Sequence, residues 1–296
     1  MMRKTTIQII ILVLIFLACL IIWYFSSEFR KQHFLAQRGH ADAQYFLGHS
    51  YDQGTNGITQ NTCQANQWWL KAAQQNYKPA QIALGNRYIQ QPSDQVECIS
   101  LPVKDIQNYV LLATEDGNYH GYYTLAEYYA KETAEKIQYL ESGALHNDPQ
   151  ALYALSSLYF SRNHAYSLHL LEKAAQLGNV KAQTFLGDVH AGLTYTSKYT
   201  DLKKALFWYE KAAAKGDSTA QKNLGLLHLY GQGTPQNYEK AAYFLKKSAQ
   251  QGDIESQLIL SMLVMYDRGL AISQYGSKDE NLNKIINMAK SGYIDA

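Results

Sequence analysis

The sequence lacks an excess of charge of either sign. Its 27 lysine and arginine residues nearly balance its 25 aspartate and glutamate residues, which leaves a formal net charge of +2. A surface that attracts nucleic acid or an acidic substrate needs a positive excess or a basic block, and the sequence has neither. The charge balance therefore argues against both kinds of partner.

The sequence also lacks the residue patterns that carry chemistry. It contains nine histidines, but no histidine pair with metal-ligand spacing accompanies a cysteine or carboxylate cluster. A nucleophile elbow, a phosphate-binding glycine loop and a zinc-protease helix are missing as well. We therefore expect a protein that is not an enzyme and that has no metal, no cofactor and no small-molecule substrate.

Cysteines are scarce. Of the three, only Cys63 and Cys98 follow the apolar N-terminal segment, and both fall where we expect irregular chain ahead of a helix. That placement would let them form a disulfide in an oxidising compartment. The alternative is two unpaired thiols in a cytoplasmic domain, and the residues alone leave both possibilities open.

One long apolar run is present at the N-terminus. Between Ile7 and Phe25 the only polar side chain is Gln8, and a helix of that length spans about 28 Å, close to the thickness of a bilayer core. We therefore predict a transmembrane signal-anchor helix over 7–25, after a short cytoplasmic tail over 1–6 and before a juxtamembrane helical linker over 26–38.

The flanks of this run leave its processing and orientation less clear. Residues 16–19 faintly resemble a lipoprotein cleavage box, but the run stays apolar after Cys19, which favours an uncleaved anchor. Arg3 and Lys4 before the run are nearly balanced by the basic residues after it. The positive-inside rule therefore does not by itself orient the chain.

A unit of about 36 residues recurs along the rest of the chain. Each unit opens on a glycine or asparagine, namely Gly39, Asn76, Gly117, Asn147, Gly178, Gly216 and Gly252. Four positions later comes a small residue, namely Ala43, Ala80, Gly121, Ala151, Ala182, Ala220 and Ser256. A further four positions on comes a leucine, namely Leu47, Leu84, Leu125, Leu155, Leu186, Leu224 and Leu260. These spacings predict the core stripe of an amphipathic helix.

A second helix is predicted in each unit. Its large residue lies eight positions before the closing glycine or asparagine, as at Trp68, Trp208 and Phe244. The closing residue suits a helix end that requires a left-handed backbone. One such helix pair cannot bury its apolar stripe alone, so the core is expected to come from stacking. His190 and His228 occupy an aromatic packing position, and we interpret them as structural.

This pattern resembles the Sel1-like repeat family, a relative of the tetratricopeptide repeats. The resemblance extends from Gly39 to Gly292 and is strongest over 220–252, which includes Gly231-Gln232-Gly233 between the two helices. It implies an all-α, right-handed α/α superhelical solenoid of about seven helix–turn–helix repeats over 39–296. The sequence departs from the pattern at a proline-containing insertion, Gln90 to Pro102, and in a shortened unit that opens at Gly117.

The resemblance to tetratricopeptide grooves also implies where a partner would bind. The groove should be lined by the residues two and six positions after each small residue. In the first four repeats these are Tyr45, His49, Ile82, Asn86, Tyr123, Glu127, Tyr153 and Ser157. Tyrosine offers a large contact area at a small entropic cost, so the N-terminal half is the candidate recognition surface.

Family resemblance further suggests a function and a location. Anchored members are commonly scaffolds in the bacterial envelope, so we expect a single-pass inner-membrane protein whose repeats face the periplasm and bind another protein. The leading hypothesis is an adaptor or accessory factor of an envelope assembly such as a secretion system. The alternative is an immunity protein that captures a toxin effector, and a cell-wall hydrolase is a remote third possibility.

Overall fold

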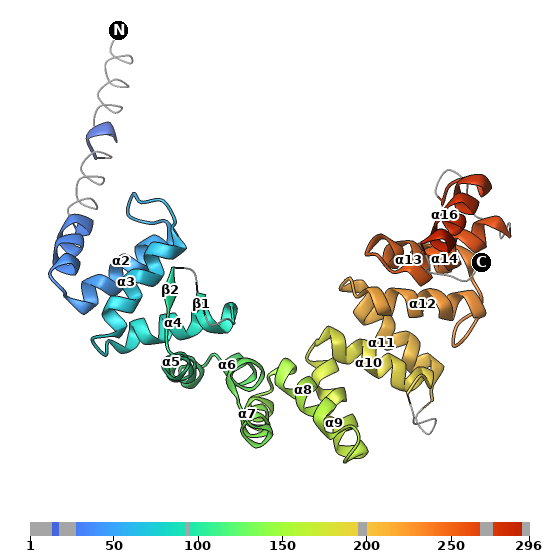
Figure 1. Cartoon of the computed structure of the whole chain (residues 1–296), viewed down its shortest axis with the longest axis horizontal. Coiled ribbons are helices and arrows are strands. Elements are labelled where there is room, and N and C mark those ends of the chain that lie inside the picture. The colour runs from blue at the N-terminus through green and yellow to red at the C-terminus, as the bar shows by residue number, and fades with distance from the viewer. Residues whose placement is uncertain are drawn as a thin grey trace, which may run out of the picture. The chain divides into compact units, whose positions relative to one another are not determined.

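The computed structural model describes residues 14–17, 28–92, 95–96, 98–194, 200–266 and 275–291. The chain divides into two compact units, Met1–His146 and Asn147–Ala296, and both are built from helices (Figure 1). The predicted membrane helix over 7–25 lies outside the described residues except for 14–17, which are helical. Within the described ranges, no helix is both long and apolar enough to cross a membrane.

The first unit begins with a helical stretch over residues 28–37. Its further elements are α2 (Ala41–Gln53), α3 (Thr62–Ala73), α4 (Lys78–Gln90), β1 (Gln95–Val96), β2 (Ile99–Ser100), α5 (Val103–Glu115), α6 (His120–Thr124), the π-helical turn η1 (Leu125–Tyr129) and α7 (Thr133–Leu145). From α2 to α6 each α-helix packs on the next one, and α7 packs on both α6 and η1.

The second unit repeats the same arrangement with greater regularity. Its elements are α8 (Pro149–Tyr159), α9 (His164–Gln176), α10 (Val180–Ala191), α11 (Leu202–Ala214), α12 (Ser218–Tyr230), α13 (Tyr238–Gln250), α14 (Ile254–Met265) and α16 (Lys278–Lys290). Each of these helices packs on the next. The chain is therefore an all-α repeat solenoid with one small strand pair.

The predicted repeat boundaries coincide with the helix ends. All seven opening residues have the left-handed backbone that the pattern requires, with φ between 60° at Asn76 and 112° at Gly117. Most of the predicted core stripe is fully buried: Ala43, Leu47, Ala80, Leu84, Ala182 and Leu186 each have 0% exposure. The phase of the repeat is thus confirmed in both units.

The glycine after the core leucine brings the two helices of a pair into close contact. A Cβ atom on Gly85 would overlap the backbone carbonyl of Tyr109, and one on Gly187 would overlap the ring of Tyr209. Larger side chains at these positions would force the paired helices apart. The small residues in the pattern are therefore explained by helix packing.

In four repeats, a glutamine next to the small residue ties the first helix to the helix before it. Gln81 donates to the carbonyl of Ala73 at 3.3 Å, and Gln183 donates to the carbonyl of Ala175 at 2.9 Å. Gln44 and Gln221 make the same bond to the carbonyl eight residues upstream. Each of these carbonyl groups also accepts a bond from the backbone N–H of the following glycine or asparagine, so the glutamine adds a second donor at the end of the helix.

The two units differ in how their first helices begin. In the second unit, Asp148, Asn179, Asp217 and Asp253 each accept a hydrogen bond of 2.7–2.8 Å from the backbone amide three residues later. In the first unit, His40, Tyr77 and Tyr119 occupy the same position and make no side-chain cap. Oxygen-bearing side chains are the preferred N-caps, so this support is confined to the second unit.

Two local features depart from a plain helical repeat, and both lie in the first unit. The insertion between α4 and α5 contains the antiparallel pair β1–β2, in which Val96 pairs with Ile99. Both side chains are buried in the same core cluster as Leu84 and Ile106. The shortened third repeat has the π-helical turn η1 in its first helix. Pattern analysis predicted the insertion and the shortening but neither the strands nor the π turn.

Candidate partner-binding groove

A cavity of about 370 Å³ lies against the first helices of two neighbouring repeats, α2 and α4. Its lining includes four residues that the repeat register places in a groove: Tyr45, His49, Ile82 and Asn86. They come together because they stand two and six positions after the buried residues Ala43 and Ala80 and so project from the same side of parallel-running repeats. The structure thus gathers half of the expected groove residues at one site.

One wall of the cavity is mostly apolar. Tyr45 packs against Tyr77 with ring centroids 5.6 Å apart, and Pro79, Ile82 and Ala83 continue the wall along α4. Tyr45 and Ile82 are half-buried and pack against the core of the unit. This wall offers contact area to an apolar or aromatic side chain of a ligand.

The other wall contains a charged pair. Arg87 of α4 donates from Nη2 to Oδ1 of Asp52 in α2, and the two side chains are only 14% and 18% exposed. The Arg87 guanidinium also lies 5.5 Å from the ring centroid of Trp69. The charges of the two residues therefore cancel within the cavity, and Arg87 is held in a fixed orientation.

Amide side chains complete the lining. Asn86 accepts a hydrogen bond of 2.7 Å from Nδ2 of Asn118, which leaves its own amide group for a ligand, and Gln90 lies at the exposed end of α4. His49 and Asp116 are exposed at the rim. A neutral wall with both donors and acceptors beside an apolar wall is suited to a segment of polypeptide.

The other four expected groove residues do not line this cavity. In the same unit, the ring of Tyr123 stacks on His120 at 5.2 Å, and Glu127 forms an ion pair of 3.0 Å with Lys136. Tyr153 and Ser157 lie on α8 and so belong to the second unit. The proposed continuous surface over four repeats is therefore divided between the two units.

Cys63 and Cys98 form a disulfide, with their Cα atoms 5.2 Å apart. Cys63 lies in the first turn of α3, and Cys98 lies at the turn between β1 and β2 with φ +63°. The bond fastens the insertion to the helix of the preceding repeat. It therefore also fixes the end of α4, which carries the polar wall of the cavity.

Pattern analysis missed the charged pair of the cavity. Arg87 stands seven positions after Ala80, and five other repeats have serine, leucine or valine there: Ser50, Leu158, Val189, Leu227 and Leu263. A charged residue at a usually uncharged register position was a usable signal. Its partner, Asp52, could not be identified without the distance between the repeats.

A second polar cluster occupies the groove side of the second unit. Oδ1 of Asp188 in α10 accepts a hydrogen bond of 2.7 Å from the Tyr209 hydroxyl and one of 3.0 Å from Nδ2 of Asn223. Burial raises the pKa of the Asp188 carboxyl, although these two hydrogen bonds oppose the rise. Burial, together with the charge of Asp188, also raises the pKa of Tyr209. The cluster joins α10, α11 and α12.

His190 and His228 lie in the core of the second unit, at 6% and 4% exposure. The ring of His228 stacks parallel to Phe244 with centroids 6.0 Å apart. Burial, followed by the charge of Lys240, lowers the pKa of His228. His228 thus packs as an aromatic residue, whereas for His190 the structure shows burial. Within the described ranges, no three His, Cys, Asp or Glu residues are grouped so that they could hold a metal ion.

Comparison with known proteins identifies the repeat. The Sel1 repeat model matches residues 41–77, 149–179, 180–217 and 218–253. The uncharacterized protein YibG of Escherichia coli K12 is 35% identical over 96 residues, which cover 30% of this chain and 61% of that protein. The chain therefore spans less than two thirds of that relative.

Solved structures agree with the family model. A protective antigen of uropathogenic Escherichia coli strains, described as displaying an SLR fold, aligns with a TM-score of 0.71 at 24% identity and covers 89% of this chain and 56% of its own. A Sel1 repeat protein from Oxalobacter formigenes aligns with a TM-score of 0.64 at 25% identity, covering 89% of this chain and 77% of its own. These two alignments show that the chain has the helical repeat fold of Sel1 repeat proteins.

Proposed function

We propose that this chain, four segments of which match the Sel1 repeat model, is a membrane-anchored adaptor that holds a protein partner in the bacterial envelope. Sel1 repeat proteins are generally interaction scaffolds and not enzymes, which supports this proposal. The observation that carries the proposal is the cavity over α2 and α4. It combines an apolar wall at Tyr45 and Ile82 with amide groups at Asn86 and Gln90, and its one arginine is already neutralised.

The disulfide supports the periplasmic location that we propose for the repeats. Disulfides persist in the periplasm and are rare in the reducing cytosol, and Cys98 is at an exposed turn where a cytosolic reductant would reach it. An alkaline phosphatase fusion after Ala296 tests the orientation in cells. We expect phosphatase activity, and an inactive fusion beside an active cytoplasmic reporter fusion would reject the periplasmic location.

The partner can be trapped at the cavity in living cells. A photo-crosslinking benzoylphenylalanine in place of Ile82 should attach to one protein, which mass spectrometry identifies. The matched control places the same group at Tyr243, an aromatic residue of α13 that is 46% exposed and lies in the other unit. A product that forms equally from both positions would contradict binding in the cavity.

A second variant tests whether formation of the crosslink depends on the apolar wall of the cavity. Tyr45→Ala removes apolar surface from the wall that also contains Ile82 and should reduce the yield of the crosslink at position 82 severalfold without loss of the folded protein. The identity of the product separates an adaptor from an immunity protein. A component of an envelope machine supports the adaptor, whereas a toxin effector would replace it with the immunity role.

A further inference from the structure

Asp188 is a half-buried carboxylate on the groove side of the second unit. It stands six positions after the buried residue Ala182, which is the register position of His49 and Asn86 in the first unit. The Tyr209 hydroxyl and the Asn223 amide both donate to its Oδ1 atom, at 2.7 and 3.0 Å. Two donors from two other helices fix the carboxylate in place, and its second oxygen takes part in neither bond.

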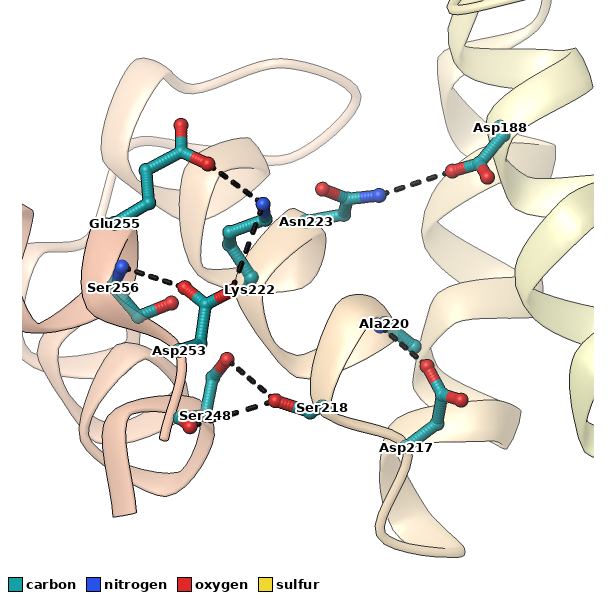
Figure 2. Close-up of polar contacts among 10 residues, drawn as sticks. All are labelled: Asp188, Asp217, Ser218, Ala220, Lys222, Asn223, Ser248, Asp253, Glu255 and Ser256. Carbon is teal, nitrogen blue, oxygen red and sulfur yellow. Dashed lines mark hydrogen bonds and ion pairs between the residues drawn. The ribbon is translucent and has the colours of Figure 1, made fainter. Parts of the chain in front are cut away.

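Lys222, the cationic residue next to Asn223 in the sequence, points away from Asp188. Figure 2 shows that Asn223 points toward Asp188, while its neighbour Lys222 points to the next repeat. Nζ of Lys222 lies 2.7 Å from Oε2 of Glu255 and 3.8 Å from Oδ2 of Asp253. The charge of Lys222 lowers the pKa of Asp188, but Lys222 is already paired with two carboxylates.

The described parts of the chain contain ion pairs for Asp52, Glu127, Asp253 and Glu255, but none for Asp188. Removing a carboxylate from water is costly unless a positive charge or several donors compensate for it. Two neutral donors offset part of this cost. A positively charged group of a bound partner would offset the rest of the desolvation cost of the Asp188 carboxylate.

Tyr153 and Asp188 stand in neighbouring repeats at the two register positions that Tyr45 and Asn86 occupy in the cavity of the first unit. Tyr153 of α8 is a half-buried groove residue, and the negative charge of Asp188 adds to the effect of burial in raising its pKa. An aromatic ring near a carboxylate is a suitable environment for lysine or arginine, because the ring contacts the alkyl stem or the cation while the carboxylate binds the charged end.

From this arrangement we propose that the groove of the second unit binds a segment of a partner protein through one lysine or arginine side chain, which Asp188 receives. The inference rests on the proposed function as a protein-binding scaffold and adds the chemistry of the partner. In the first unit the partly buried carboxylate, Asp52, is already paired with Arg87, and the other carboxylate of the cavity, Asp116, is exposed to water.

Selection of random peptides displayed on phage tests the inference on the full chain in detergent. We expect peptides selected by the wild type to share an arginine or lysine at one position. Asp188→Asn keeps an oxygen that can accept from Tyr209 and Asn223, so the fold should be retained while the charge is lost. Glu210→Gln is the matched control, because it removes one exposed carboxylate from α11 without touching the cluster.

The measured quantity is the affinity of one selected peptide and of its citrulline form, which has the shape of arginine but no charge. Losing a charge-assisted hydrogen bond should weaken binding about tenfold. We expect this loss from Asp188→Asn or from citrulline, and little further loss when both are combined. Glu210→Gln should bind as the wild type does.

Three results would overturn the inference. Selected peptides without a shared basic residue would show that the scaffold binds protein segments by other contacts, and the proposed function would stand. A citrulline peptide that binds the wild type unchanged would do the same without relying on any variant. Failure to select any peptide above the background of an unrelated protein would reject both the inference and a groove that binds polypeptide.

Discussion

The first and second units use one repeat but stabilise it by different means. In the second unit, four first helices begin at an aspartate or asparagine that caps the helix. In the first unit, histidine or tyrosine stands at those positions, and the disulfide between Cys63 and Cys98 is present instead. The second unit is thus stabilised in small steps along its length, whereas the first depends on one covalent bond beside its insertion.

The two grooves differ in charge in a parallel way. Asp52 in the first unit is neutralised by Arg87 from the next repeat, and the other carboxylate of its cavity, Asp116, is exposed at the rim. Asp188 in the second unit has only neutral donors. The same scaffold can therefore present a surface that selects a partner by shape or one that selects it by charge.

Removal of the disulfide should have the largest effect and should be limited to the first unit. The bond closes a loop with a sequence separation of 35, and the chain entropy of such a loop corresponds to about 4 kcal/mol. Cys63→Ser combined with Cys98→Ser should lower the free energy of opening of α3 to α5, measured by hydrogen exchange and mass spectrometry. Equal losses in α10 to α13 would show that the units are not independent.

Adding a methyl group where paired helices touch should destabilise the first unit more than the second, by about 1 kcal/mol or more. Gly85→Ala places a methyl group against the backbone carbonyl of Tyr109, which cannot move aside, whereas Gly187→Ala meets the ring of Tyr209. Overpacking costs about 1–3 kcal/mol, and we expect Gly85→Ala near the upper end and Gly187→Ala nearer the lower. Chemical denaturation of both variants measures the two costs, and the reverse order would contradict this account.

Removing a helix N-cap from the second unit and adding one to the first should make the stabilities of their first helices more alike. The backbone of His40, with φ −68° and ψ 117°, closely matches that of Asp217, with φ −63° and ψ 119°. Asp217→Ala should destabilise α12 by about 1 kcal/mol, and His40→Asp should stabilise α2 by up to about 1 kcal/mol. Hydrogen exchange of the first turns reports both, and His40→Gln serves as the control for loss of the imidazole alone.

The smallest expected effect is a pH dependence confined to the second unit. Burial raises the pKa of the Asp188 carboxyl above the ordinary pKa of an aspartate side chain. The stability that this group contributes is therefore complete below the unfolded-state pKa and is lost as pH rises through the folded-state value. Asp188→Asn should therefore stabilise α10 relative to the wild type more at pH 7 than at pH 3. An equal change at both values would contradict the sign, and Glu210→Gln controls for net charge.

Much of the fold could be predicted from the sequence because it depends on spacing within one helix pair. The left-handed positions from Gly39 to Gly252 follow from where a helix must end, and the burial of Ala182 and Leu186 follows from a shared helical face. These features need no knowledge of how one repeat is rotated against the next. They are local properties that recur in each repeat.

The features that prediction missed depend on contacts between repeats. The pairing of Asp52 with Arg87 and that of Asp188 with Tyr209 and Asn223 join helices of successive repeats, and spacing along a helix does not give those distances. The strands at Val96 and Ile99 belong to an insertion with no counterpart in other repeats, so periodicity could not describe them. Half of the expected groove residues converge on the cavity because their two repeats are adjacent and regular.

The glutamine bond that four of the repeats share has a consequence for how such an array can grow. Gln221 and the carbonyl of Ala213 lie on either side of a repeat boundary, only eight residues apart. A duplicated segment such as 180–217 would therefore carry the carbonyl at its end and its own Gln183 near its start. Each new repeat boundary would therefore contain both the glutamine donor and the carbonyl acceptor of this hydrogen bond. The gene could lengthen by whole repeats without a second, compensating mutation.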